Sequence, residues 1–100
     1  MNLGLFIKSL RVKKELTLHQ VCIASNIDST ILSKIERSER LPTIKQLELL
    51  SVFFEVSFES LQTKLIAEKI QKEYGINQIT INALKMVQEG FVIHMKEKND

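Results

Sequence analysis

Short hydroxyl side chains and cations share one face of a predicted helix in the segment IDSTILSKIERSER, residues 27–40. Apolar residues recur at Ile31, Leu32 and Ile35, the spacing of a buried helical stripe, so the rest of this helix faces outward. The outward side chains are Ser29, Thr30, Ser33, Lys34 and Arg37. Hydroxyl groups donate and accept hydrogen bonds, whereas lysine and arginine only donate. This face therefore suits hydrogen bonding to a polar, anionic partner, and a merely solvated surface is the alternative.

Charge is distributed unevenly along the chain, although the net charge is only +2. Residues 8–45 carry eight cations against four anions, whereas residues 46–100 carry six cations against eight anions. A basic half joined to a mildly acidic remainder is typical of a polyanion-binding module followed by an association segment. A solvated surface without such a partner would explain the same charges.

The composition narrows the class of protein. A chain of 100 residues with 44% apolar residues forms one domain, or one domain with a helical appendage, and is not disordered throughout. The single Cys22 cannot form an internal disulfide, which fits a reducing compartment. No signal-peptide pattern and no apolar run long enough to cross a bilayer is present. We therefore expect a cytoplasmic protein.

Helical spacing and capping residues recur along the chain, while strand signals are almost absent. The first predicted helix begins near Leu3 and ends near Glu15. The second is capped by Thr17, with Gln20 three residues later as in a capping box. The third is capped by Asp28 or Ser29 after a short turn. These elements place the hydroxyl and cationic face on the third helix.

Three further helices are predicted after the loop that Pro42 ends. Thr43, Ser57 and Asn77 are their expected caps. The fourth helix should bury Ile44, Leu47, Leu50 and Phe54. The fifth should carry Phe58, Leu61, Leu65, Ile66 and Ile70, and end near Gly75. The sixth carries an apolar stripe at Leu84, Val87, Phe91 and Met95. The sequence thus predicts an all-α protein.

Two short helices joined by a tight turn, with Thr17 as cap and Asn26-Ile27-Asp28 as turn, form a helix-turn-helix pattern. Residues 17–38, with their Ile35-Glu36-Arg37-Ser38 ending, resemble the Xre family of lambda-repressor-like DNA-binding domains, and residues 41–61 follow the same family pattern. The resemblance implies a five-helix DNA-binding domain over residues 1–62 with an additional C-terminal helix. Residues 63–100 are then a helical extension for dimerisation.

The resemblance also implies roles for individual residues. It assigns base reading to Ser29, Thr30, Ser33 and Lys34, and a structural ion pair to Arg11 and Glu36. Phosphate contacts are expected from Arg37, which lies one turn further along the helix, and from Arg40, Lys45 and Thr17. The chain departs from the family at Asn26, Ser38 and Glu55, where glycine is common, and at Leu18, where a polar residue often contacts phosphate. We therefore assign no phosphate contact to Leu18.

Other chemistry is weakly supported by the sequence. His19 and Cys22 are spaced as a pair of metal ligands on a helix, but no second pair with structural-zinc spacing exists. Cys22 is better explained as a small apolar residue. No glycine-rich phosphate loop and no activated nucleophile is recognisable. We expect neither an enzyme nor a metal, cofactor or small-molecule ligand.

The predicted function is that of a transcription regulator that binds double-stranded DNA. The apolar stripe of the sixth helix, Leu84, Val87, Phe91 and Met95, either closes the core of one chain or forms a dimer seam. A homodimer reading a palindromic operator would double the contacts of one reading helix. Residues 27–40 particularly resemble regulators of restriction–modification systems. An antitoxin that also binds its own promoter, and a protein-interaction module without DNA affinity, are the alternatives.

Overall fold

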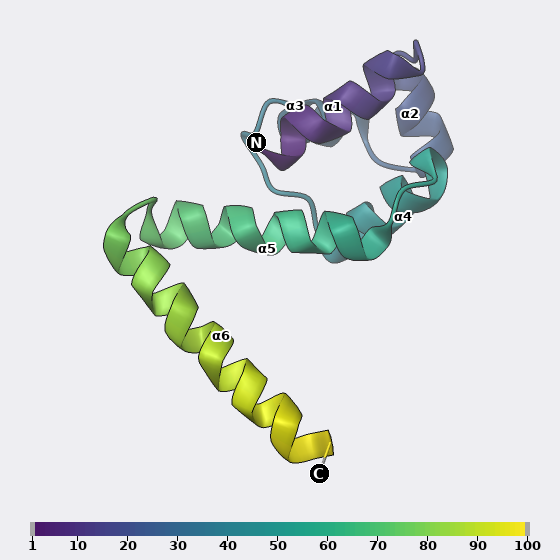
Figure 1. The fold of residues 1–100 in the computed structure, drawn as a ribbon. Coiled ribbons are helices and arrows are strands. Elements are labelled where there is room, and N and C mark those ends of the chain that lie inside the picture. Colours follow the sequence, from purple (N-terminus) through teal and green to yellow (C-terminus); the bar gives the residue numbers. More distant parts are fainter. Residues whose placement is uncertain (1, 100) are drawn as a thin grey trace. The chain divides into compact units, whose positions relative to one another are not determined.

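The computed structural model describes residues 2–99 of the chain, with side chains as far as Glu97. These residues form six helices joined by short loops, and none of them lies in a strand (Figure 1). The helices are α1 (Leu3–Lys13), α2 (Leu18–Ser25), α3 (Ser29–Glu36), α4 (Ile44–Phe54), α5 (Phe58–Tyr74) and α6 (Gln78–Asn99). The predicted all-α class is confirmed.

Reciprocal capping fixes where α2 and α4 begin. The backbone N–H of Gln20 donates to Thr17 Oγ1 at 3.1 Å, and the Thr17 N–H donates to Gln20 Oε1 at 2.8 Å. Thr43 and Gln46 repeat this pair of bonds at α4, at 3.1 and 2.9 Å. Each box satisfies two backbone donors at an end where helical partners are missing, so both helices begin where the sequence predicts.

Left-handed backbone conformations fix where the helices end. Asn26, Ser38 and Glu55 have φ values of 58°, 61° and 55°. These are the three positions where the resembling family commonly has glycine, which adopts this conformation without steric cost. Glu15 is a fourth such residue, with φ of 57°, and α1 therefore ends at Lys13 rather than near Glu15.

One hydrophobic core joins α1 to α5. Its buried members are Leu3, Ile7, Val21, Ile27, Leu32, Ile35, Leu47, Leu50, Phe54, Leu61 and Leu65. The helix α3 packs against both α1 and α2, and α2 packs against α4. Because the apolar stripe of α3 packs against both α1 and α2, the opposite face of α3 points outward in a fixed orientation.

One predicted core position, Ile44, is wrong. Ile44 is 48% exposed because, as the first residue of α4, it lies at the end of the helix and outside the group of side chains that pack against the core. Ile66 is 57% exposed. It lies about 140° around α5 from the buried Leu61 and so points away from the core. Cys22 and Leu18 on α2 are half-buried.

The chain divides into two compact units, Met1–Lys69 and Ile70–Asp100. In the second unit, Gly75 adopts φ of 84° after α5, and Asn77 caps α6 by accepting from the Thr80 N–H at 2.9 Å. From residue 70 to residue 97 no side chain is buried. Within residues 2–99, no helix combines the length and apolar character needed to cross a membrane.

Candidate nucleic-acid interface

The outward face of α3 begins at a charged cap. Asp28 Oδ1 accepts hydrogen bonds from the backbone N–H groups of Thr30 at 2.8 Å and Ile31 at 3.3 Å. Next to this cap, the side chains of Ser29 and Thr30 are exposed. Their hydroxyl groups are therefore available at the N-terminal end of α3, the end that contacts base edges in known helix-turn-helix complexes.

The same face continues along the next turn of α3. Lys34 is exposed, and Ser33 beside it is half-buried. On the opposite side Leu32 and Ile35 are 0% and 1% exposed. The structure therefore brings all four predicted base-reading side chains onto one surface of a single helix, with Ser33 nearest to the protein.

A paired arginine and glutamate tie α3 to α1. Arg11 Nε donates to Glu36 Oε2 at 2.8 Å, and Arg11 Nη2 donates to Glu36 Oε1 at 2.9 Å. Arg11 Nη1 also donates to the Leu16 carbonyl at 2.8 Å, so the guanidinium joins α1, α3 and the loop before α2. Glu36 is 5% exposed, and a bidentate pair in this setting fixes the angle of α3.

The pairing also changes the acidity of Arg11. Its hydrogen bonds to Glu36, helped by the negative charge of that carboxylate, raise the pKa of Arg11 against the opposing effect of burial. Because the pKa of Arg11 is raised by folding, its charged form stabilises the folded protein, and this contribution is fully present at any pH below the ordinary pKa of arginine. This contribution would be lost only as the pH rises through the raised value, far above neutrality.

Gly4 is a positioning residue that sequence reasoning missed. A side-chain carbon at this position would collide with the carbonyl oxygen of Ile35 and crowd the Glu36 carbonyl and Ser38 Oγ. The first turn of α1 therefore lies against the last turn of α3, where only glycine fits. No sequence signal marks this contact, because its two sides are about thirty residues apart in the chain.

The end of α3 is closed by a Schellman motif that turns the chain toward the loop. The Ser38 N–H donates to the Ile35 carbonyl at 3.0 Å, and the Glu39 N–H donates to the Lys34 carbonyl at 2.9 Å. Arg37, the C-cap of α3, and Arg40, beyond the turn, are both exposed. Arg37 forms a 3.2 Å ion pair with Glu39 that is more than half exposed on both sides and therefore weak enough to exchange for phosphate.

The other two predicted phosphate contacts lie at helix N-termini. Thr17 precedes α2, and its Oγ1 accepts from Gln20 N–H, so the hydroxyl proton remains available to donate. Lys45 is in the first turn of α4, exposed, with Glu48 3.9 Å away. Both positions add the partial positive charge of a helix N-terminus to the side chain's own donor.

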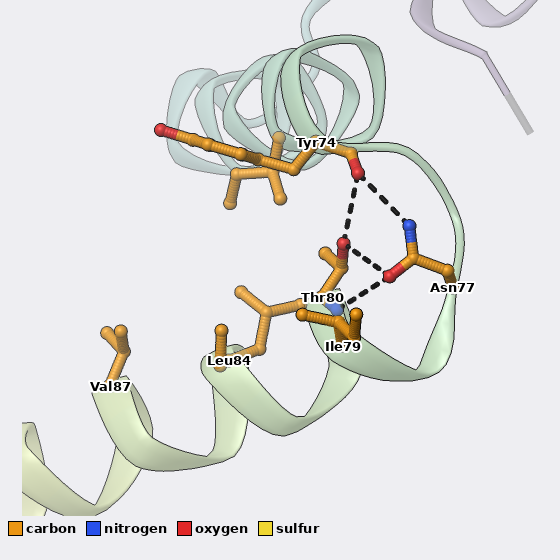
Figure 2. Close-up of a pocket in the computed structure, with 8 residues that line it drawn as sticks. Tyr74, Asn77, Ile79, Thr80, Leu84 and Val87 are labelled. Atoms are coloured by element: carbon orange, nitrogen blue, oxygen red, sulfur yellow. Dashed lines mark hydrogen bonds between the residues drawn. The ribbon is translucent and has the colours of Figure 1, made fainter.

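The four residues of the predicted dimer seam form an exposed stripe on α6. Leu84, Val87, Phe91 and Met95 are 43%, 51%, 62% and 63% exposed. A cavity of about 570 Å³ lies within the second unit, and Figure 2 shows Leu84 and Val87 of α6 lining it together with Tyr74 of α5. Asn77 and Thr80 close one end with hydrogen bonds to the Tyr74 carbonyl, both 3.2 Å long.

Comparison with known proteins identifies the family. The arrangement of α2, the turn at Asn26 and α3 is that of a helix-turn-helix protein. The family model HTH_3, Helix-turn-helix, matches residues 7–61, more than half of the chain, and the chain belongs to this family. No curated protein sequence matches the chain significantly.

The fold is also found in solved structures. A chain from the complex of the SinR protein with the SinI protein is similar, with a TM-score of 0.56 and 23% identity. The similarity covers 98% of the present chain and 99% of that chain. At this level of identity the likeness shows a common helical fold, which agrees with the expected Xre-like helix-turn-helix architecture.

Proposed function

We propose that this protein is a transcription regulator that binds a specific sequence in double-stranded DNA. The observation that carries the proposal is the presentation of α3: its inner face is buried, and its outer face offers Ser29, Thr30 and Lys34 to solvent. Membership of the helix-turn-helix family supports DNA as the partner. No catalytic role is proposed for any residue.

Hydrogen-bonding chemistry and position separate the residues that read bases from those that contact phosphates. Serine and threonine hydroxyls accept or donate to base edges in the major groove, and a lysine ammonium donates to guanine O6 and N7. Ser29, Thr30, Ser33 and Lys34 therefore read bases. The more distant Thr17, Arg37, Arg40 and Lys45 contact phosphates, which fixes the register of α3 without reading sequence.

We further propose that two copies of the chain bind a palindromic operator. One eight-residue reading helix contacts only a few base pairs, whereas a twofold dimer doubles the contacts. Support comes from α6, whose apolar stripe at Leu84, Val87, Phe91 and Met95 is exposed in the single chain. Covering that stripe with its counterpart in a second copy removes apolar surface from water.

The regulated genes and the protein partners are further parts of the proposal. The resemblance of residues 27–40 to controllers of restriction–modification systems favours a restriction–modification operon as the target. A second candidate is an antitoxin-like protein that binds another protein as well as its promoter. The similar solved chain comes from a complex of two different proteins, which favours testing for a protein partner.

Nuclease footprinting on the DNA upstream of the protein's own gene tests the proposal. A dimer on a palindrome should protect two half-sites whose centres are about 34–36 Å, or one helical turn, apart. Protection of two such half-sites in a fixed sequence supports the proposed function. Uniform protection that follows no sequence, or none at a concentration where the protein is folded, contradicts it.

A further inference from the structure

Asp28 differs from the other helix caps of the described chain. Every other N-cap side chain that accepts a hydrogen bond within residues 2–99 is neutral: Asn2, Thr17, Thr43, Ser57 and Asn77. Only α3, the helix that faces the proposed DNA partner, begins with a carboxylate. The negative charge of Asp28 therefore lies where the DNA is proposed to bind.

Capping alone does not require this charge. Asparagine and serine cap helices about as well as aspartate. A carboxylate close to DNA phosphates is repelled by them, and this repulsion weakens binding to every sequence. Within the protein the charge is favourable, because a carboxylate at a helix N-terminus is stabilised by the helix dipole. Beside DNA, the repulsion is offset if the carboxylate accepts a hydrogen bond from the DNA itself.

The geometry leaves one carboxylate oxygen for that role. Both capping hydrogen bonds, from Thr30 N–H and Ile31 N–H, end on Oδ1. Among the described residues no hydrogen bond or ion pair reaches Oδ2, and the side chain is exposed. The cap also holds the carboxylate rigidly beside Ser29 and Thr30. An acceptor is thereby fixed at the end of α3 that lies closest to the base edges.

We infer that Asp28 is a specificity-determining residue that selects cytosine in the operator through Oδ2. In the major groove cytosine presents the N4 amino group as a donor, and aspartate is a suitable acceptor for it. Guanine and thymine present acceptors on the same edge and repel the carboxylate, and adenine sets its N7 acceptor beside the N6 donor, which makes it a poorer partner than cytosine. The inference rests on the proposed function and adds a residue and a base preference to it.

Selection of binding sites from a randomised DNA pool tests the inference. The wild-type protein is compared with Asp28→Asn and Asp28→Ser, which keep a capping oxygen and remove the charge. Glu59→Gln is the matched control, because it removes one negative charge from the first turn of α5, outside the proposed interface. Thermal unfolding of each variant, measured in parallel, shows whether α3 remains capped.

We expect both Asp28 variants to lose the preference for cytosine at one position of each half-site, by roughly five- to a hundredfold. With Asp28→Asn, the amide oxygen keeps the cap and the amino group turns a donor toward the base, so guanine or thymine should replace cytosine. Glu59→Gln should leave the selected sequence unchanged.

Three results would overturn the inference. Folded Asp28 variants that select the wild-type sequence would make Asp28 a cap only. Loss of preference at all positions together, in both variants, would mean that Asp28 acts through the stability of α3. If the wild-type protein enriches no sequence at all, the proposed function fails as well, which distinguishes this outcome from the other two.

Discussion

Arg11 and Glu36 are joined by two hydrogen bonds of 2.8 and 2.9 Å across twenty-five positions of the sequence. Both side chains are largely withdrawn from solvent, at 14% and 5% exposure. The pair links the end of α1 to the last residue of α3, next to the face that we propose reads DNA. We therefore expect a single contact to affect both stability and the proposed DNA recognition.

Substitution Glu36→Ala should lower the free energy of unfolding by about 3 kcal/mol, because it leaves a partly buried guanidinium without its partner. Chemical denaturation of the wild type and the variant measures the difference. DNA affinity should fall as well, since α3 loses the contact that fixes its angle.

Glu39→Ala is the control for this substitution. It removes the exposed partner of Arg37, and such surface pairs contribute about 0–1 kcal/mol. An unchanged unfolding midpoint for Glu36→Ala would show that the Arg11–Glu36 pair behaves as an ordinary surface contact.

Substitution by alanine should lower the free energy of unfolding at Gly4 and raise it at Gly90, the two helical glycines. Gly4→Ala places a methyl group against the backbone of Ile35 and Glu36 and should destabilise the protein by about 1–3 kcal/mol. At Gly90 nothing lies within 4 Å of the added carbon. Gly90→Ala should therefore increase helicity or stability, by up to about 1 kcal/mol. Circular dichroism during thermal unfolding measures both, and a stabilised Gly4→Ala variant would contradict the close approach of α1 to α3.

Local signals were sufficient to predict most of the helices, whereas contacts distant in the chain were not predictable. Thr17 and Thr43, each three residues before a glutamine, indicate helix starts through bonds confined to one turn. The Gly4 contact depends on how α1 and α3 pack, which no local pattern encodes. Ile44 was misplaced because apolar character alone does not tell which side of a helix its neighbours cover.

The candidate site was predictable to a similar extent. A helical pattern identifies which side of α3 faces outward, and the structure brings the predicted reading residues onto that side. Half-burial of Ser33 and the two hydrogen bonds on a single oxygen of Asp28 depend on side-chain geometry and could not be read from spacing.

Two substitutions on α3 should separate base reading from phosphate binding. Lys34→Ala should relax the sequence preference at one base pair, with a loss of about 1–3 kcal/mol on the preferred sequence. Arg37→Ala should weaken binding to all sequences alike and reduce the slope of log K against log[salt] by about one. Binding titrations on operator and scrambled DNA at several salt concentrations measure both effects. If both variants changed sequence preference and salt dependence in the same way, the proposed separation of base reading from phosphate binding would be contradicted.

The α6 stripe should carry the dimer. Phe91→Ser removes the aromatic member of the stripe, whose side chain is 62% exposed in the single chain. We expect the dimer dissociation constant to rise at least tenfold by analytical ultracentrifugation, since burial of a phenylalanine contributes about 1.5–3 kcal/mol. Glu89→Ser, elsewhere on the same exposed helix, is the matched control. A monomeric wild-type protein at high micromolar concentration, or a Phe91→Ser variant with unchanged association, would contradict this assignment.

The central claim is that the outward face of α3 binds a specific DNA sequence, and a gel-shift titration on upstream DNA at two salt concentrations tests it most directly. Neutralised phosphates release counterions, so the specific complex should weaken steeply with salt, by roughly 0.9 powers of ten per contact for each tenfold increase. Scrambled DNA should bind more weakly at both concentrations. Affinity that is the same for both DNAs and indifferent to salt would contradict the account.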